Sequence, residues 1–365
     1  MITGDKSVLV GMSGGIDSTA VCCMLLEEGH RVEGLTFITC DAGVAAAEAA
    51  ARLADRLGIP HHVADVRERF AREVVEPFVA GYLSGFTPNP CVNCNPNIKF
   101  ALLEEYADRL GCADIATGHY VRKEQRGKSK EERFYIVAGD DFRKDQSYFL
   151  WRLTQQQLSR VIFPLGGMEK TQVVEYLKQR GYSCVASGGE SMEVCFIPGD
   201  YRDFLRESVA DIDARFAGGS FVDNQGRVLG RHAGFPFFTI GQRKGLGIAL
   251  GYPAYVTKIN PVKNTVMLGR EEELLASYML VDTPQWVDGV PDGLSVRVRY
   301  RSAPVRCDAP REVDDGRWLV RLHEKVSAIT PGQSAVFYVG NMVVGGAFIS
   351  QQRGINQWID NSETI

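Results

Sequence analysis

Short strands and helices alternate along residues 7–116, and this alternation constrains the fold more than any other feature of the sequence. Apolar runs typical of strands are Ser7–Val10, Val32–Phe37, His61–Ala64 and Asp114–Ala116. The segments expected to be helical are Ser18–Glu28, Gly43–Leu57, Arg67–Leu83 and Ile98–Leu110. Strands that alternate with helices in this way predict an α/β fold, with a doubly wound parallel sheet covered by helices.

The pattern changes after residue 218, where turn residues such as Asp223-Asn224 and Asn260-Pro261 recur at short intervals. Between them, Tyr255–Ile259 and Leu294–Tyr300 alternate with a period of two. This half is expected to be β-rich, with a small central domain followed by a C-terminal β-barrel. The expected domain boundaries are residues 1–205, 206–273 and 274–365.

Composition excludes several classes of protein. No stretch approaches the roughly 18 apolar residues of a membrane span, and Met1–Lys6 does not resemble a signal peptide, so a cytoplasmic protein is expected. Nine cysteines without a signal peptide favour reduced, catalytic or metal-binding thiols over a disulfide framework. The net charge of -4 means that an RNA partner would need a local basic surface.

A glycine-rich turn joins the first expected strand to the first helix. It comprises Gly11, Met12, Ser13, Gly14, Gly15, Ile16, Asp17 and Ser18. Glycines permit a tight turn whose backbone N–H groups, at the positive end of a helix, suit a pyrophosphate. Asp17 is expected to act in catalysis by holding Mg²⁺ against the phosphates. The alternative is a turn that binds no ligand, and the sequence is not a Walker loop.

This SGG-x-DS motif resembles the PP-loop of ATP pyrophosphatases, which have an adenine nucleotide alpha hydrolase-like fold. These enzymes split ATP between the α- and β-phosphates and adenylate an oxygen. A second stretch, Ala116–Tyr120, resembles the same superfamily. GMP, NAD and asparagine synthetases share the motif with tRNA-modifying enzymes, so the motif leaves the substrate open.

Three cysteines narrow the choice of chemistry. Cys91 and Cys94 are expected in a proline-stiffened loop before a helix, and Cys195 follows a Gly-rich loop. An adenylated carbonyl attacked by ammonia gives an amide, whereas persulfide sulfur gives a thiocarbonyl, and a second thiol can resolve the intermediate. The alternatives are half of a zinc site or a thioredoxin-like pair for Cys91 and Cys94, and a plain core residue for Cys195.

The combined motifs resemble the tRNA-specific 2-thiouridylase (MnmA) family over nearly the whole chain. The matching stretches are Val8–Ser18, Pro88–Phe100, Ala116–Val121, Lys144–Phe149, Cys195–Ile197 and Phe238–Gly247. The resemblance implies that Cys94 is the nucleophile and Cys195 carries the persulfide. It assigns ATP binding to Gly11–Ser18, Phe37 and Gly118. The positions that it places near the target base or the tRNA are Asn89, Pro90, Cys91, His119, Lys144, Asp145, Gln146, Arg299, Tyr300 and Gln333.

The activity implied is that of a tRNA-uridine 2-sulfurtransferase using ATP and Mg²⁺. ATP adenylates O2 of the wobble uridine, sulfur on Cys195 displaces AMP, and Cys94 then closes a disulfide with Cys195. The partners implied are a tRNA with a wobble uridine and an upstream protein that donates persulfide sulfur. The competing functions are a PP-loop amidotransferase or ligase acting on a small molecule, a non-catalytic tRNA-binding protein, and thiolation at another tRNA position.

The chain departs from the family pattern at Cys91, where an Asp is usual. This suggests a second hypothesis, in which Cys91, Cys94 and Cys195 hold a [4Fe–4S] cluster whose fourth iron binds the sulfide being transferred.

The alternation of Val296–Arg301 also predicts a strand with three arginines on one face, a candidate phosphate-binding row.

Overall fold

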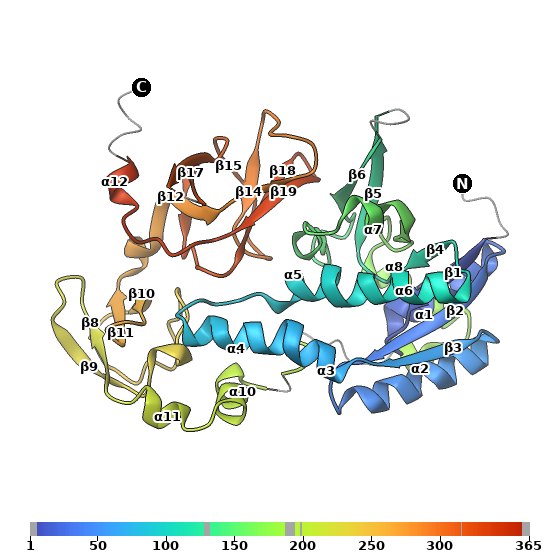
Figure 1. Cartoon of the computed structure of the whole chain (residues 1–365), viewed down its shortest axis with the longest axis horizontal. Coiled ribbons are helices and arrows are strands. Elements are labelled where there is room, and N and C mark those ends of the chain that lie inside the picture. Colours follow the sequence, from blue (N-terminus) through green and yellow to red (C-terminus); the bar gives the residue numbers. More distant parts are fainter. Residues whose placement is uncertain (1–5, 128–131, 187–193, 198, 315, 360–365) are drawn as a thin grey trace. The chain divides into compact units, whose positions relative to one another are not determined.

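The computed structural model describes residues 6–127, 132–186, 194–197, 199–314 and 316–359 (Figure 1). The chain forms two compact units. Unit 1 comprises Met1–Val75, Pro90–Phe196 and Asn341–Val344. Unit 2 comprises Glu76–Asn89, Ile197–Gly340 and Gly345–Ile365. Each unit is therefore built from segments that are far apart in the sequence.

Unit 1 contains a five-stranded parallel sheet in the order β3-β2-β1-β4-β7. The strands are β1 (Ser7–Gly11), β2 (Arg31–Ile38), β3 (His61–Asp65), β4 (Asp114–Ala116) and β7 (Val161–Ile162). The four expected strands are confirmed, and β7 was not predicted. The strand order runs in opposite directions on the two sides of β1, so the carboxyl end of β1 is a topological switch point, where ligands bind in such sheets.

Helices cover this sheet, and those expected at Ser18–Glu28, Gly43–Leu57 and Ile98–Leu110 are confirmed. They are α1 (Ile16–Glu27), α2 (Gly43–Leu57), α3 (Arg67–Phe70), α5 (Pro90–Cys94), α6 (Ala101–Leu110), α7 (Gln155–Arg160), α8 (Lys170–Gln179) and α9 (Ser183–Ala186). Leu9 and Val10 of the central strand are fully buried, as are Ala20 and Val21 of α1. The core of unit 1 therefore lies between the sheet and its helices.

The helix expected over Arg67–Leu83 is interrupted. After α3, a π-helical turn η1 (Ala71–Val75) precedes α4 (Glu76–Leu83). The boundary between the two units follows Val75. A π turn offsets the helical register, which periodicity along the sequence does not reveal.

An antiparallel hairpin completes unit 1. It is formed by β5 (Val121–Arg126) and β6 (Arg133–Ala138). Met342 pairs with Val137, and the Ala138 N–H donates to the Asn341 carbonyl at 2.8 Å. The segment Asn341–Val344 of unit 1 thus pairs with the free edge of this hairpin.

Unit 2 is β-rich, as predicted. One sheet has the order β10-β11-β8-β9, formed by β8 (Gly219–Val222), β9 (Val228–His232), β10 (Tyr255–Asn260) and β11 (Thr265–Gly269). A second has the order β12-β17-β16, formed by β12 (Leu275–Asp282), β16 (Arg311–Asp314) and β17 (Arg317–Ser327). Short helices α10 (Tyr201–Ser208) and α11 (Ile212–Arg215) precede these sheets, and α12 (Asn356–Ile359) follows them.

The remaining strands of unit 2 are short. They are β13 (Gln285–Trp286), β14 (Ser295–Arg297), β15 (Val305–Arg306) and β18 (Ser334–Val339), and β19 (Met342–Phe348) is divided between the two units after Val344. In β18, Val336 and Phe337 are fully buried, and Trp286 packs on Phe337 with ring centroids 5.0 Å apart. Within the described part of the chain, no helix has the length and apolar character needed to cross a bilayer.

Candidate active site

The glycine-rich turn leaves β1 at the switch point of the sheet and opens α1. Gly14 has φ of +72°, and a Cβ there would lie 3.1 Å from the Ala50 nitrogen, so the turn requires glycine. The Ser18 hydroxyl accepts from the Ser13 N–H at 3.2 Å. No side chain caps the start of α1 at Gly15. Uncapped N–H donors at a helix start, held in a fixed turn, form a site suited to phosphate.

Two of the predicted nucleotide positions lie at this same edge of the sheet. Phe37 is near the carboxyl end of β2 and is partly exposed. Gly118 follows β4, and a Cβ at this position would lie 2.8 Å from the Asp17 Cβ. Only glycine therefore lets the segment after β4 approach the glycine-rich turn this closely.

Asp17 faces a cation. The Lys170 ammonium donates to its two carboxylate oxygens at 2.8 and 2.9 Å, and the Tyr120 hydroxyl donates to one of them at 2.6 Å. Lys170 is the first residue of α8. The structure therefore pairs the carboxylate that was expected to hold Mg²⁺ with a lysine and a tyrosine.

The cysteine segment is helical, so the prediction of a loop there is wrong. Cys91 and Cys94 lie three residues apart on α5 and share one face. Pro90 starts this helix, where its missing N–H costs nothing. Pro96 would disrupt a regular helix, and the chain instead forms a π turn, η2 (Asn95–Phe100), before α6. Residues five apart are neighbours across such a turn, which brings Lys99 beneath Cys94.

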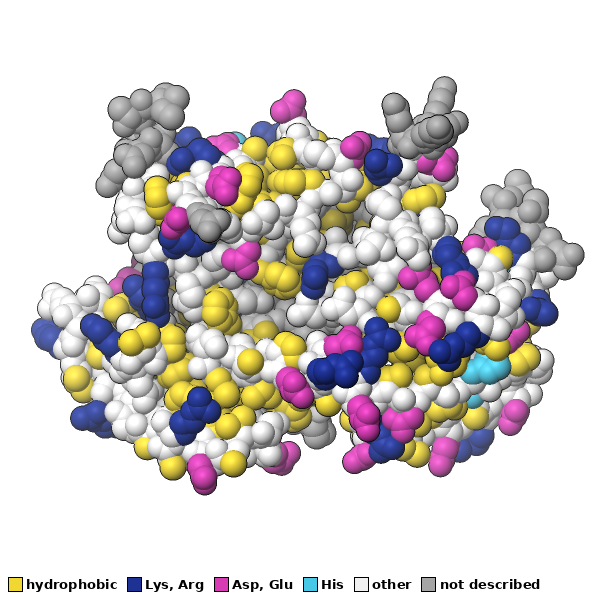
Figure 2. Space-filling view, in the orientation of Figure 1, with side chains coloured by type: hydrophobic (Ala, Val, Ile, Leu, Met, Phe, Trp, Pro, Cys, Tyr) yellow, Lys and Arg dark blue, Asp and Glu magenta, His cyan; other side chains and the backbone are white. Residues whose placement is uncertain are grey.

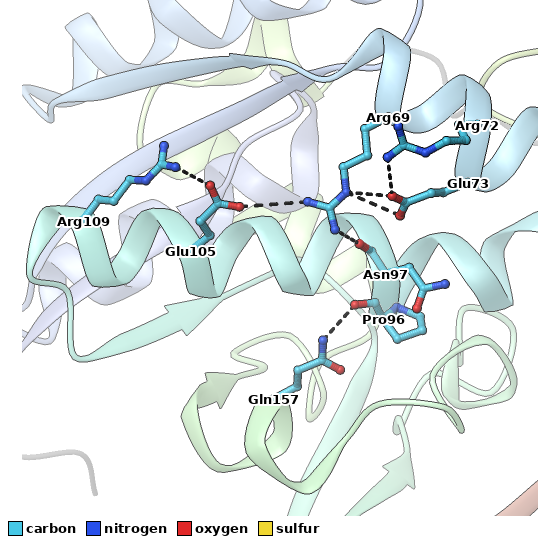
Figure 3. Close-up of polar contacts among 8 residues, drawn as sticks. All are labelled: Arg69, Arg72, Glu73, Pro96, Asn97, Glu105, Arg109 and Gln157. Atoms are coloured by element: carbon cyan, nitrogen blue, oxygen red, sulfur yellow. Dashed lines mark hydrogen bonds and ion pairs between the residues drawn. The ribbon is translucent and has the colours of Figure 1, made fainter.

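Side chains from other helices hold this π turn (Figure 3). The Pro96 carbonyl accepts from Gln157 Nε2 of α7 at 2.8 Å, and the Asn97 carbonyl accepts from the Arg69 guanidinium of α3 at 2.8 Å. Arg69 is itself held by ion pairs to Glu73 and Glu105. The irregular backbone after the cysteines is thus fixed by specific donors.

The thiols of Cys91, Cys94 and Cys195 lie near enough to Lys99 to interact with its charge. Burial raises the pKa of Cys94 to about 12, while Lys99 opposes this shift. Burial likewise raises the pKa of Cys91 and of Cys195, again against the effect of Lys99, although Cys195 is exposed to solvent. Burial disfavours the charge on Lys99, but nearby Cys94, Cys91 and Cys195 raise its pKa above the ordinary value. Lys99 is therefore the group that favours a thiolate in this cluster.

His119 connects the thiol cluster to the glycine-rich turn. Burial, and then the nearby Lys99, lower the pKa of His119 to about 3, so the imidazole is neutral at physiological pH. Its ring stacks on Phe100 at 5.8 Å, and Nδ1 lies 2.8 Å from the Thr117 hydroxyl. His119 follows Gly118, which touches Asp17, so one short segment contacts both parts of the site.

The predicted segment Lys144–Gln146 contributes to this framework. The buried Asp145 carboxylate accepts from the Gly139 and Ser147 N–H groups at 3.2 and 3.0 Å. Gln146 Oε1 accepts from the Tyr120 N–H at 3.1 Å, and Lys144 is partly exposed. Asp145 thus fixes its own loop, and Gln146 holds Tyr120, which contacts Asp17.

The remaining predicted tRNA positions lie in unit 2. Gln333 donates to the Thr87 carbonyl at 2.8 Å, two residues before Asn89. The Arg299 guanidinium donates to the Ile240 carbonyl at 3.0 Å and to the Thr330 hydroxyl at 2.6 Å. Since β14 ends at Arg297, the predicted strand with three arginines is wrong, and Arg299 and Tyr300 lie in the turn that follows.

Charge and metal ligands were also expected to mark the site. On the face shown in Figure 2, basic and acidic side chains are interspersed. Among residues 6–127, 132–186, 194–197, 199–314 and 316–359, no group of three or more His, Cys, Asp or Glu side chains is arranged to hold a metal ion. Cys91, Cys94 and Cys195 do not form such a ligand set in this structure.

Sequence reasoning missed three side chains of the site: Lys99, Tyr120 and Lys170. Lys99 and Tyr120 lay within the matching stretches, and the only signal for Lys99 was a lone cation five residues after Cys94. Lys170 begins α8 more than 150 residues after Asp17. Nothing local to Lys170 connects it with the glycine-rich turn, so tertiary structure was needed to find it.

A parallel sheet with a glycine-rich turn at its switch point defines the class of α/β proteins that bind nucleotides at this edge of the sheet, and here an adjoining helix carries two thiols. Three family models match the chain in succession. They are the tRNA methyl transferase HUP domain at residues 6–199, the tRNA methyl transferase PRC-barrel domain at 202–270, and the aminomethyltransferase beta-barrel domain at 276–349.

Relatives extend the match to nearly full length. The chain is 55% identical to tRNA-specific 2-thiouridylase MnmA 3 of Bacteroides fragilis, over 98% of each chain. It is 43% identical to tRNA-specific 2-thiouridylase MnmA of Cytophaga hutchinsonii, over 94% of this chain and 96% of that protein. The chain belongs to the tRNA-specific 2-thiouridylase (MnmA) family.

A solved structure shows a weaker likeness. The U34-tRNA thiolase NcsA from Methanococcus maripaludis, solved with its [4Fe-4S] cluster, aligns with a TM-score of 0.36 at 15% identity. The alignment covers 58% of this chain and 68% of that chain, and it is too weak to carry an argument.

Proposed function

We propose that this protein is a tRNA-uridine 2-sulfurtransferase that thiolates the wobble uridine with ATP and cysteine-borne sulfur. The observation that carries the proposal is the arrangement of unit 1 in a chain of this family. A phosphate-binding turn and a cluster of three thiols are linked there through Gly118 and His119. Adenylation and sulfur transfer need these two kinds of site close to one base.

The first step is adenylation. O2 of the uracil attacks the α-phosphorus of ATP, forming an O–P bond, and the bond to the bridging oxygen breaks, with its electron pair leaving on pyrophosphate. The turn at Gly14 and the uncapped start of α1 bind the phosphates. Mg²⁺ enters this scheme bound to the phosphates, since it commonly uses few protein ligands and keeps several waters.

The second step is sulfur transfer. The terminal sulfur of a Cys195 persulfide attacks C2, and AMP leaves. The Cys94 thiolate then attacks Sγ of Cys195, which forms the Cys94–Cys195 disulfide and releases the thiocarbonyl on the tRNA. An external thiol reductant must reopen the disulfide, and a persulfide-carrying protein must reload Cys195. Because burial raises the pKa of Cys94, the positive charge of Lys99 is needed to generate the thiolate.

The cluster hypothesis predicts a different composition of the protein. Three thiolates from Cys91, Cys94 and Cys195 would hold iron, yet these side chains do not form a ligand set as they lie here. We therefore assign no step to a cluster. Iron and acid-labile sulfide should be absent from protein purified without oxygen, and about four of each per chain would establish the cluster instead.

Unit 2 is proposed to supply tRNA contacts from Arg299, Tyr300 and Gln333. We also propose the three-domain division with boundaries near residues 205 and 273. Arg299→Glu should weaken tRNA binding and reduce the slope of log affinity against log salt, because a phosphate contact releases counterions. An unchanged salt slope would count against the contact.

The function is tested by a mercury-affinity gel of tRNA after anaerobic incubation with Mg-ATP, a persulfide donor and a thiol reductant. Wild type should give a retarded band, and Cys94→Ser and Cys195→Ser should lose it. Cys307→Ser, a buried cysteine of unit 2, is the matched control and should keep it. The Cys91→Ser lane shows whether the departure from the usual Asp matters.

The same gel separates the rival functions. A small-molecule amidotransferase would give no band in any lane, and its activity would survive both cysteine changes. A tRNA-binding protein would bind tRNA without consuming ATP. Mapping the thiolated nucleotide distinguishes the wobble uridine from any other position.

A further inference from the structure

The strongest feature that the proposed function leaves unexplained is the cation held against Asp17. Lys170 lies far along the chain from the glycine-rich turn, yet its ammonium contacts both carboxylate oxygens of a residue within that turn. The neighbouring Ser18 hydroxyl accepts from the Ser13 N–H of the same turn. Lys170 thus meets the phosphate-binding turn directly.

The surroundings of Lys170 are built for this contact. Its side chain is 14% exposed, and its ammonium lies 5.8 Å from the centre of the Tyr120 ring. Tyr120 donates to the same carboxylate and is braced by Gln146. Gly118 leaves the space that this arrangement requires, since a Cβ there would press on Asp17. Four elements of unit 1 therefore converge on one ion pair.

Local electrostatics do not favour a lysine at this position. Lys170 is the first residue of α8, where the positive end of the helix favours an acidic side chain. Partly buried ion pairs also add little stability, because desolvation offsets their attraction. A stabilising role alone therefore explains the residue poorly. An anion that arrives beside Asp17 would offset both costs.

We propose that Lys170 is a catalytic residue of the nucleotide site, which contacts the β- and γ-phosphates of ATP and stabilises the departing pyrophosphate. Asp17 and Tyr120 are positioning residues that hold the ammonium at the turn before ATP binds. During adenylation the bond from the α-phosphorus to the bridging oxygen breaks, and its electron pair and negative charge move onto pyrophosphate. Lys170 neutralises this charge and exchanges no proton. The inference rests on the proposed adenylation and adds a residue to it.

The test compares Lys170→Met with Lys178→Met, an exposed lysine of the same helix. Calorimetry of the full chain measures the affinity for Mg-ATP, pyrophosphate and AMP without tRNA. Lys170→Met should weaken binding of ATP and pyrophosphate on the order of 10- to 100-fold, the effect of one hydrogen bond to a charged group. AMP affinity should stay unchanged in both variants, because AMP lacks the leaving group. Lys170→Arg should restore part of the lost affinity.

Two outcomes would overturn the inference. If Lys170→Met weakens the binding of ATP and AMP equally, Lys170 contacts the nucleoside part of the nucleotide or the variant is misfolded. The thermal unfolding midpoint and the Lys170→Arg variant distinguish these two explanations. Unchanged affinities in Lys170→Met would reduce the contact to a structural ion pair. Because these measurements omit tRNA, failure of the proposed function would appear only as a missing thiolated product and would leave the binding result intact.

Discussion

Two partly buried lysines of unit 1 have opposite surroundings. Lys170 faces the carboxylate of Asp17 and is held by hydrogen bonds of 2.8 and 2.9 Å. Lys99 faces the thiols of Cys91, Cys94 and Cys195, whose pKa values burial raises, so they are mostly protonated at neutral pH. One cation has a carboxylate partner, and the other has thiol partners that acquire charge in the proposed reaction.

This difference separates two tasks of the site. A lysine with a fixed counterion stays in place and serves a substrate that is always negative. A lysine among neutral thiols lowers the cost of forming a thiolate when one is needed. The environment of Lys99 should therefore respond to pH within the range of thiol titration.

The largest expected effect comes from removing the charge of Lys99. In Lys99→Met the pKa of Cys94 should rise further, because the cation that opposes the effect of burial is lost. The rate of alkylation of Cys94 by iodoacetamide at neutral pH, followed by mass spectrometry, should fall roughly tenfold or more, because the thiolate fraction falls as the pKa rises. The thiolation rate at neutral pH should fall with it. Lys170→Met should leave the alkylation rate unchanged, and equal losses in both variants would remove the distinction.

A second prediction concerns the close approach at Gly118. Gly118→Ala places a methyl group 2.8 Å from the Asp17 Cβ, so the glycine-rich turn or the segment after β4 must shift. ATP affinity should fall roughly tenfold, the loss of about one good hydrogen bond. Gly167→Ala is the control, because its Cβ would meet only an Asp140 oxygen at 3.8 Å. Equal ATP affinity in both variants would contradict the packing argument.

A third prediction tests the support of the π turn that carries Lys99. Gln157→Glu retains an acceptor for the Thr154 N–H but loses the donor to the buried Pro96 carbonyl. The free energy of unfolding should fall by about 1–3 kcal/mol, the cost of an unsatisfied buried acceptor. Chemical denaturation measures this, with the exposed Gln225→Glu as control. An unchanged denaturation midpoint would show that the carbonyl has another partner.

The smallest effect is expected at Arg69. Arg69→Gln removes the donor to the Asn97 carbonyl and two ion pairs, but the side chain is 34% exposed. We expect a loss of about 1 kcal/mol or less, because solvent screens such pairs. The loss should shrink in high salt, and a loss larger than that of Gln157→Glu would reverse the order proposed for the two supports.

The parallel sheet could be predicted because its signals are local. Each strand from β1 to β4 is a short apolar run followed by a helix with its own boundaries. The same local reasoning failed at Cys91–Cys94, where prolines indicated a loop. Pro90 instead starts a helix, and Pro96 is accommodated by a π turn whose carbonyls are satisfied from α3 and α7. These donors lie too far away in sequence to be foreseen.

The site, too, could be predicted only where its residues lie in recognisable local motifs. Motif resemblance pointed to the glycine-rich turn and to the cysteines, which lie on recognisable segments. It did not assign Lys99 or Lys170 a role, because their function depends on which side chains surround them in space. For Arg299 the alternation of Val296–Arg301 predicted a continuing strand, but β14 ends at Arg297 and the chain turns.

The arrangement of unit 1 along the chain has a consequence for synthesis on the ribosome. The hairpin of β5 and β6 pairs with Met342, which is translated some two hundred residues after Val137. Until then the edge of β6 lacks this partner, and exposed strand edges promote association with other chains. A fragment that stops near residue 199 would keep the glycine-rich turn and all three cysteines, but it would carry that open edge permanently. Nascent chains of this protein should therefore depend on chaperone binding until translation is almost finished.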